Sequence, residues 1–360
     1  MFLTGGTADI TVHARTDNGK LKEVYPASGG SWGGKDVEEN FLEFFQDIVG
    51  KKVFDIFKKD EMEDYMDLMR DFENLKRSFV RTSTNVSLRI PVALNDIIEV
   101  HTNYTSFRQL LGASKNVSKD ITFEKGKLIF PSQKFEAFFH PVVQGILQHL
   151  ENLFRNEKVK NVDKILMVGG FSDCKLVQDS MREAFRNKTV ITPNEAGLIV
   201  LKGAVYFGHL TEPISVRVSR YTYGIQSWPE FDPAVHPKNK MTVVNGVKRC
   251  RDVFFKFVTR GEEVTPGHRM SQTFQVLKPD EDTLECIVYA SDEEDPKFVD
   301  SPDCRTVMKL SIPLQALSLN SRMNMEIEES LIFGETELKC YAKEYNTGKD
   351  FEVKSFFGSH

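Results

Sequence analysis

The hydrophobic pattern of this 360-residue chain changes its period near residue 210. Before that point, apolar residues recur at the three- and four-residue spacing of amphipathic helices, between short β-like stretches. After Pro213 the helical spacing is lost, and β-rich stretches alternate with Pro, Gly and acidic turns. We therefore predict an α/β domain over residues 1–210 and a β-rich module over residues 211–360.

Within the first part, the strongest helical stripes cover residues 61–79 and 132–155, the second with Ser132 as its cap. Another helix is expected from about Asp36, after a glycine-rich loop over residues 28–34, and residues 95–111 are ambiguous. Residues 164–186 read as strand, glycine turn and helix, a pattern of α/β folds in which ligands bind at the carboxyl ends of strands. We treat residues 51–160 as an inserted subdomain.

Composition excludes several classes of function. The formal net charge is -5 and the pI about 6.0, so the basic surface that nucleic-acid binding needs is not expected. No apolar run is long enough to span a bilayer, and the first residues do not resemble a signal peptide. The five scattered cysteines and unclustered histidines favour a reducing compartment over disulfides or a metal site. The cytoplasm is the expected location.

A glycine-rich turn, Gly5-Gly6-Thr7, opens the first expected strand. Glycines let backbone N–H groups approach phosphate oxygens, and a threonine hydroxyl adds a hydrogen bond. Asp9 is placed to lie near the metal ion that accompanies phosphates. A tight β-turn without a ligand explains the same residues, because short glycine motifs are weak evidence on their own.

Two further motifs are compatible with a nucleotide, and each also has an ordinary structural explanation. Gly169 and Gly170 join a strand to a helix, whose N-terminus attracts anions, but close packing of helix on strand also requires glycine. Glu73 and Lys76 lie three residues apart on one helical face. A solvated ion pair worth a few tenths of a kcal/mol is the usual reason for such a pair.

The order of these motifs resembles the second lobe of the actin-like ATPase fold. It is most similar to the 70-kDa heat-shock proteins and, among them, to the divergent heat shock 70 kDa protein 12 subfamily. The chain presents a G-G-T turn, a second glycine pair before a helix, an E-x-x-K helix, a V-G-G turn and a P-x-E-A helix followed by Gly-Ala. The likeness covers nearly the whole chain, and the stretches that carry it are 5–13, 22–23 with 27–30, 166–171, 197–208 and 333–338.

This resemblance implies a chaperone-related protein that binds ATP with Mg²⁺, with client polypeptides or co-chaperones as further partners. It implies no catalytic residue and no direct metal ligand in this chain. The residue roles that it implies are phosphate binding by Gly5, Gly6 and Thr7, proximity to the cations for Asp9, an approach to the sugar-phosphate region for Gly34, adenosine contacts for Glu73 and Lys76, and closure of the pocket around the nucleoside by Gly169 and Gly170.

The chain also departs from the family pattern D-x-G-G-G-T, because Phe2 replaces the acid and Thr4 the first glycine. Lys35 stands at an acidic position, and Asp173 where ordinary members supply an arginine. The family's first lobe, with its catalytic lysine and carboxylates, is expected before residue 1. Since phosphoryl transfer needs charge stabilisation from several sides, we expect a truncated form with impaired hydrolysis.

Three functions are compatible with these observations. The first is the ATP-binding, chaperone-related protein just described. The second is a non-enzymatic interaction module whose nucleotide site is vestigial, which Phe2, Thr4 and Asp173 favour. The third is a sugar or acetate kinase of the same fold, and the long β-rich part after residue 210 argues against it.

Overall fold

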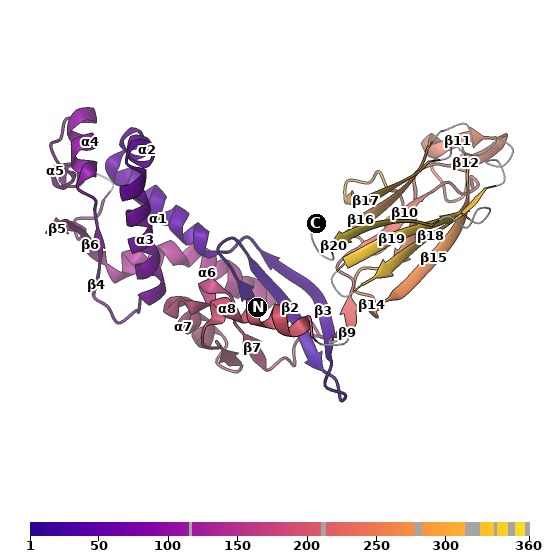
Figure 1. Cartoon of the computed structure of the whole chain (residues 1–360), viewed down its shortest axis with the longest axis horizontal. Helices are drawn as coiled ribbons and strands as arrows, with labels where there is room; N and C mark the ends of the chain where they lie inside the picture. Colours follow the sequence, from indigo (N-terminus) through magenta and orange to yellow (C-terminus); the bar gives the residue numbers. More distant parts are fainter. Residues whose placement is uncertain are drawn as a thin grey trace. The chain divides into compact units, whose positions relative to one another are not determined.

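The computed structural model describes residues 1–114, 117–209, 214–277, 283–313, 325–334, 337–344 and 350–356, the last range without the side chains of 351–356. The chain divides into two compact units, which are described separately below (Figure 1). The first comprises Met1–Ile10 and Ser28–His209, and the second comprises Thr11–Ala27 and Leu210–His360. The expected mixture of helices and strands in several sheets is confirmed.

The N-terminal strands belong to a five-stranded sheet of order β1-β2-β3-β9-β14. The alternation of β2 buries Ala8, Ile10 and Val12 on one face. In the first unit, β7 and β8 form a two-stranded parallel sheet. Phe2 of β1 forms an isolated parallel bridge with Val168, two residues after the end of β7. The strands concerned are β1 (Phe2–Leu3), β2 (Ala8–Arg15), β3 (Leu21–Gly30), β7 (Lys164–Leu166), β8 (Thr189–Ile191), β9 (Ile214–Val218) and β14 (Glu263–Val264).

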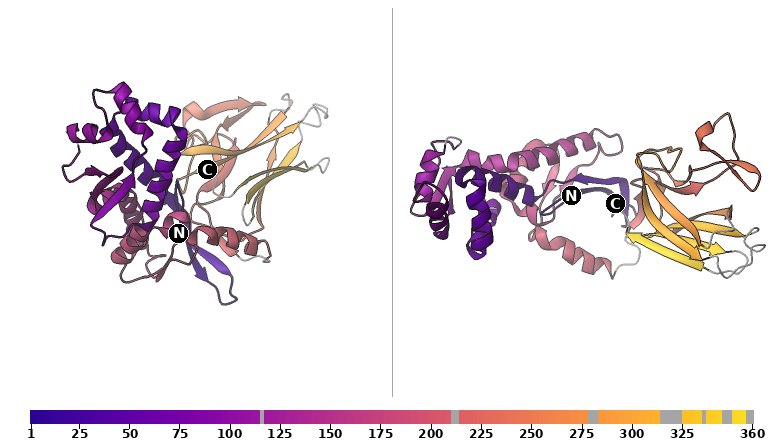
Figure 2. Two further views of the ribbon diagram at one scale, coloured as in Figure 1. Left: turned by 60° about the vertical axis from the view of Figure 1, so that its left-hand side comes forward. Right: turned by 90° about the horizontal axis from the view of Figure 1, so that it is seen from above.

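Helices and a small sheet make up the rest of the first unit (Figure 2). Phenylalanine dominates the packing between them: the rings of Phe41 and Phe72 stack with centroids 4.1 Å apart, and Phe135 lies against Phe72. These contacts fix α1 against α3 and α6. The elements are α1 (Gly34–Val49), α2 (Lys51–Asp60), α3 (Met62–Ser78), β4 (Asn85–Arg89), α4 (Ala93–His101), α5 (Phe107–Ala113), β5 (Thr122–Glu124), β6 (Lys127–Pro131) and α6 (Ser132–Phe154).

Several local predictions are corrected. Ser28–Gly30 is the end of β3 rather than loop, and α2 was not anticipated. Helix α1 begins at Gly34, two residues before the expected start at Asp36, and the Asp36 carboxylate in its first turn accepts the Gly33 N–H at 2.7 Å. Ser132 is the first residue of α6, and its hydroxyl donates to the Ser83 carbonyl. Of the ambiguous residues 95–111, 95–101 belong to α4 and 107–111 to α5, with a short connection between them.

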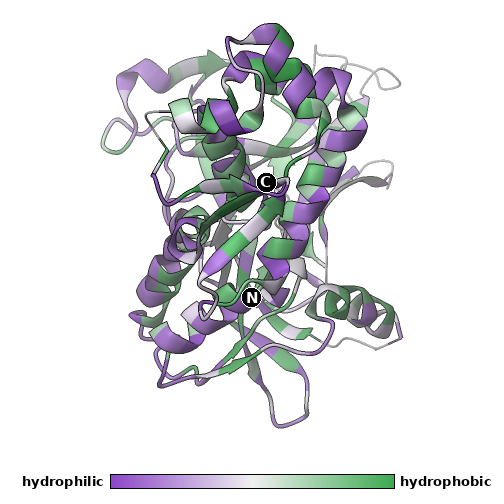
Figure 3. Ribbon diagram, turned by 90° about the vertical axis from the view of Figure 1, so that its left-hand side faces the viewer, coloured by the Kyte–Doolittle hydropathy of each residue, from purple (hydrophilic) through white to green (hydrophobic). Residues whose placement is uncertain are grey.

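After β7, the chain forms a short 3-10 turn, η1 (Gly170–Asp173), followed by α7 (Lys175–Ala184) and α8 (Ala196–Phe207). Helix α7 is amphipathic and buries Leu176, Val177 and Met181. Helix α8 differs, because its sequence is apolar all round and Ala196 is its only buried residue. In the hydropathy colouring of Figure 3, most residues of α8 fall on the hydrophobic, green side of the scale.

The described part of the second unit contains two antiparallel four-stranded sheets, of order β13-β10-β16-β17 and β15-β18-β19-β20. Apolar side chains of both sheets share one core, which includes Ile225, Val288, Ile327 and Leu331. The strands are β10 (Thr222–Ser227), β13 (Val253–Val258), β15 (His268–Gln275), β16 (Thr283–Ser291), β17 (Cys304–Pro313), β18 (Glu326–Phe333), β19 (Glu337–Glu344) and β20 (Asp350–Phe356), with a separate hairpin of β11 (Met241–Val244) and β12 (Val247–Cys250).

Part of the predicted family stretch 333–338, Glu335 and Thr336, lies outside the described residues. All five cysteines are described and carry free thiols. In the ranges that the structure describes, no helix is both long and apolar enough to cross a membrane.

Candidate functional site

The turn between β1 and β2 is held by the side chain of Thr4. Its Oγ1 accepts the N–H of Thr7 at 2.9 Å and that of Gly6 at 3.2 Å. The Thr4 N–H in turn donates to the Thr7 carbonyl at 2.9 Å. Two of the three backbone donors that sequence reasoning assigned to a phosphate, those of Gly6 and Thr7, are therefore satisfied by a hydroxyl of the chain itself, in a local pattern that threonine favours in turns.

Asp9 is tied to the same turn, because the Thr7 hydroxyl donates to its Oδ2 at 2.9 Å. The turn is otherwise open: a Cβ added to Gly6 would meet no atom within 4 Å, and one added to Gly5 would only approach the side chain of Lys35 at 3.6 Å. Gly5, Gly6 and Thr7 are all exposed. Space and a positive side chain thus exist beside the turn, while no described group of three or more His, Cys, Asp or Glu side chains could hold a metal ion.

The start of α1 packs against the β1–β2 turn. Two of its first N–H groups donate to turn carbonyls, Gly34 to Thr4 at 3.0 Å and Lys35 to Gly5 at 2.7 Å. Because these donors are occupied, the helix N-terminus supports the turn and is not open to an anion. The approach requires glycine at position 33, where a Cβ would lie 2.2 Å from the Gly5 carbonyl oxygen.

Lys76 of α3 is 4% exposed and reaches the same point from the other side. Its ammonium donates to the Gly34 carbonyl at 3.1 Å and to Glu38 of α1 at 2.6 Å, and it also pairs with Glu73. Burial raises the pKa of Glu73, but hydrogen bonds from Lys76 and Arg77 outweigh it and leave this pKa below its ordinary value. The pair is therefore a buried link between α3 and α1 rather than the solvated pair that the spacing alone suggests.

Gly169 and Gly170 follow β7 and have different surroundings. Gly169 has a φ of +96°, and a Cβ there would lie 2.2 Å from the Leu3 carbonyl oxygen. Close packing against β1 thus requires this glycine. Gly170 is open, with no atom within 4 Å of its Cβ position, and the next residue, Phe171, places its ring 3.4 Å from the Cβ position of Gly34.

The structure therefore brings most of the sequence-predicted residues into one region. Gly34 is its centre, since it contacts the turn through Thr4, the charged pair through Lys76 and the second glycine turn through Phe171. Sequence reasoning missed the partner Glu38, the packing role of Phe171 and the hydroxyl contacts of Thr4. Only the Thr4 contacts had a local signal, a threonine three residues before Thr7.

Two residues at the edge of this region are inert. Burial raises the pKa of the Cys174 thiol to about 12, so it stays protonated at neutral pH and is a poor nucleophile. Phe2, which stands where the family has an acid, packs its ring on the second glycine turn, 2.8 Å from the Cβ position of Gly169. It fills space and offers no charge.

Replacing Lys76 by methionine is expected to destabilise the first unit by about 2 kcal/mol, because Glu38 and Glu73 would keep their charges in a half-buried site with fewer partners. The measurement is urea unfolding followed by circular dichroism. Arg77→Met is the control, because the ion pair of this exposed side chain within the described residues is with Glu73. Equal losses for both variants would contradict a buried link through Lys76.

Comparisons with known proteins find relatives that cover nearly the whole chain. The chain is 31% identical to heat shock 70 kDa protein 12A of Homo sapiens over 97% of its own length and 52% of that protein. It is 30% identical to heat shock 70 kDa protein 12B of Homo sapiens over 99% of its length and 53% of that protein. Heat shock 70 kDa protein 7, chloroplastic, of Arabidopsis thaliana is 24% identical over 66% of the chain and 30% of that protein. No family model matches.

These relatives confirm the resemblance to the 70-kDa heat-shock proteins, and among them to the heat shock 70 kDa protein 12 subfamily, that the motifs indicate. The chain spans about half the length of the curated relatives it matches.

Proposed function

We propose that this chain forms one wall of an ATP site in a chaperone-related protein of type 12, and that its hydrolytic activity is impaired. The observation that carries the proposal is the convergence of three separate chain segments at Gly34: the Gly5-Gly6-Thr7 turn, α3 through Lys76, and η1 through Phe171. In this proposal Gly5, Gly6 and Thr7 hold the phosphates and Asp9 lies near the Mg²⁺ that accompanies them.

The nucleoside end of the proposed site lies on the other side of Gly34. Gly170 leaves its backbone open, and it follows Gly169, whose positive φ turns the chain at this point. The Glu73 side chain is 32% exposed beside the buried Lys76. Lys76 is held by Gly34 and Glu38, so its proposed contact to adenosine is indirect and consists of positioning Glu73. Residues 1–210 are then the second lobe of an actin-like domain, with 51–160 inserted, and 211–360 a separate β-rich module.

A phosphate fits this turn under one condition. Gly5 and Gly6 leave room for it and Lys35 lies beside the turn, but the N–H groups of Gly6 and Thr7 are already bonded to Thr4 Oγ1. A phosphate must displace that hydroxyl, which costs part of its binding free energy. ATP would supply the phosphoryl group to be transferred, and the chain's own residues would bind and orient it.

Helix α8 supports the idea that a further lobe covers this unit. It leaves Leu201 65% exposed, Val205 61% exposed and Tyr206 68% exposed. Contiguous apolar surface of this kind usually marks an interaction face. The relatives are about twice as long as the chain, and we assign the cover to their additional lobe. The catalytic charges would come from that lobe, since Phe2 supplies none here.

The second candidate is a non-enzymatic, cytoplasmic interaction module whose nucleotide site is vestigial. The observation that favours it is again Thr4, whose hydroxyl satisfies the turn without any ligand. Clients or co-chaperones would then be the functional partners and nucleotide would be irrelevant. Both candidates share the fold and differ in one measurable property, the response of nucleotide binding to the removal of this hydroxyl.

Replacing Thr4 by glycine is expected to raise the affinity for Mg²⁺-ATP about tenfold, because two N–H groups are released for phosphate oxygens. Each hydrogen bond to a charged group is worth about 1.5–3 kcal/mol, and the more flexible turn of the glycine variant offsets part of this gain. Fluorescence anisotropy of a labelled ATP analogue measures it, in this chain and in a longer form carrying a first lobe. Thr4→Ser keeps the hydroxyl and should bind like the original chain.

No binding by any variant, with or without the first lobe, would refute the ATP site and leave the interaction module. Binding that is unchanged by Thr4→Gly would show that phosphate does not use this turn. Hydrolysis is followed in the same samples through phosphate release, and we expect it to require the longer form.

A further inference from the structure

A cavity of about 400 Å³ lies between the two sheets of the second unit, far along the chain from the proposed nucleotide site. One sheet contributes residues of β10 and β16 to its walls, and the other contributes residues of β15 and β18. A cavity of this size accommodates a small organic molecule. Polar and apolar residues both line it, and the side chains used below are Phe274, Leu284, Cys286, Ile327 and Glu329.

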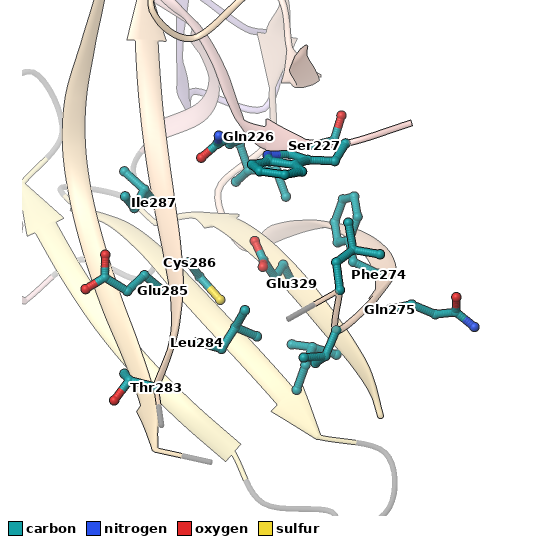
Figure 4. A pocket seen from close by; sticks show the side chains of 15 residues that line it. Gln226, Ser227, Phe274, Gln275, Thr283, Leu284, Glu285, Cys286, Ile287 and Glu329 are labelled. Carbon is teal, nitrogen blue, oxygen red and sulfur yellow. The ribbon is translucent and has the colours of Figure 1, made fainter. Parts of the chain in front are cut away.

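The unusual member of this lining is Glu329. It lies on β18 between Ile327 and Leu331, two residues of the apolar core, so the alternation of the strand turns its side chain inward. Only 8% of Glu329 is exposed, and the residue paired with it on β19, Ala342, is too small to fill the space beside it. Figure 4 shows the Glu329 carboxyl in the same space as the side chains of Leu284 and Cys286.

The Glu329 carboxyl is only partly satisfied. The Cys286 thiol of the opposite sheet is its hydrogen-bonding neighbour, while Oε2 is buried without a partner among the described residues. Among the described residues, the titratable side chains that interact with it are two thiols, Cys286 of β16 and Cys340 of β19, and neither supplies a positive charge. A buried carboxyl with an unused oxygen is costly in a sandwich core, where an apolar residue would pack as well.

Within the described chain, the neighbouring β16 side chains Glu285 and Ile287 do not compete for this oxygen. Glu285 and Ile287 alternate with Leu284 and Cys286 along β16 and point away from the cavity (Figure 4). Glu285 instead pairs with Lys309 of β17 at 2.6 Å. The polar lining residues Gln226, Ser227, Gln275 and Thr283 carry no charge, so Oε2 of Glu329 is the acidic acceptor that a ligand would meet beside the apolar part of this cavity.

We propose that this cavity binds a compact, largely apolar molecule with one primary ammonium group, which donates to Glu329 Oε2 while its apolar body packs on Phe274, Leu284 and Ile327. An ammonium supplies both the missing donor and the missing positive charge, whereas a neutral donor would leave an ionised carboxylate unpaired. The proposal is independent of the nucleotide site, because every residue that carries it belongs to the second unit.

The test compares two probes of one shape, 2-phenylethylamine and 2-phenylethanol, titrated into the full chain at pH 8 and followed by ligand-observed NMR and calorimetry. The amine should bind at least about tenfold more tightly than the alcohol, a preference equal to one charge-assisted hydrogen bond. Glu329→Gln should abolish the preference. Glu285→Gln is the matched control, because this nearby carboxylate faces away, and it should retain the preference in full.

Leu284→Trp, which fills the cavity, should remove the binding of both probes. Circular dichroism of each variant establishes that it is folded, and Glu329→Asp, which withdraws the carboxyl by one methylene, serves if the glutamine variant does not fold. The proposal is overturned if neither probe binds, if both bind equally, or if the preference for the amine survives Glu329→Gln. Binding of an apolar peptide without preference for an amine would also overturn it.

Discussion

Replacing Gly33 by alanine is expected to destabilise the first unit by about 3 kcal/mol or more and to separate α1 from the β1–β2 turn. The added Cβ would lie 2.2 Å from the carbonyl oxygen of Gly5 and 2.6 Å from the carbonyl carbon of Gly6. Both are backbone atoms, so no side chain can rotate to make room. Overpacking of this kind costs about 1–3 kcal/mol. Moving the turn away also breaks the hydrogen bonds from Gly34 and Lys35, each worth about 1 kcal/mol.

The matched control is Gly6→Ala, because a Cβ at that position meets no atom within 4 Å. The chain has two tryptophans, and Trp32 is the one in the first unit. Urea unfolding followed by Trp32 fluorescence, on a Trp228→Phe background, therefore reports on this unit. A Gly33→Ala variant as stable as Gly6→Ala would refute the close packing of the β1–β2 turn against the start of α1.

The same pair of variants separates folding from binding. Gly6→Ala should fold normally, but its methyl group would occupy space that the proposed phosphate needs, so labelled ATP should bind more weakly. Gly33→Ala should lose both stability and binding. Unchanged ATP binding by a folded Gly6→Ala variant would place the phosphates elsewhere.

Much of the fold of the first unit could be predicted from local pattern. The apolar stripe of α3 and the alternation of β2 are each complete within one element, so the spacing alone indicates them. Helix α2 was missed because it is short, at 10 residues, and only a glycine separates it from α1. The lobe assignment and the domain limits stay predictions.

The sequence indicates the glycines of the candidate site, together with Thr7, Asp9, Glu73 and Lys76, but not most of the contacts that hold them. Gly5, Gly6, Gly34, Gly169 and Gly170 stand out in sequence, because glycine marks close approaches of the backbone. The partners that hold them do not. Glu38 meets Lys76 from 38 residues away, and no local spacing indicates that contact. Whether a predicted donor is already used also depends on rotamers, as the Thr4 hydroxyl illustrates.

Glu329 shows the same limit in the second unit. The alternation of β18 puts its side chain on the inner face, and that much follows from the sequence. The Cys286 thiol opposite it, and the unused Oε2, arise only when two sheets pack together. Local sequence pattern therefore does not predict the partners of polar groups that tertiary packing buries, and Glu329 is such a group in the wall of a cavity.

Replacing Glu329 by glutamine is expected to raise the free energy of unfolding of the second unit by about 3 kcal/mol at pH 8 and to change it little at pH 4. Burial raises the pKa of this carboxyl from 4.5 to about 7. Between those values the folded state holds a proton that the unfolded state has released, so stability falls as pH rises through this window and stays lower above it. Each pKa unit is worth about 1.4 kcal/mol.

Glutamine cannot ionise, so the variant should lack this pH dependence. The measurement is urea unfolding at pH 4, 6 and 8, followed by the fluorescence of Trp228, which lies in the second unit, on a Trp32→Phe background. Glu326→Gln is the control, since Glu326 is an exposed carboxylate of the same strand. A difference between Glu329→Gln and the original chain that is the same at all three pH values would contradict a carboxyl held protonated by burial. Stabilisation at pH 8 would show that Glu329 persists at a cost to the fold, as expected of a residue kept for binding.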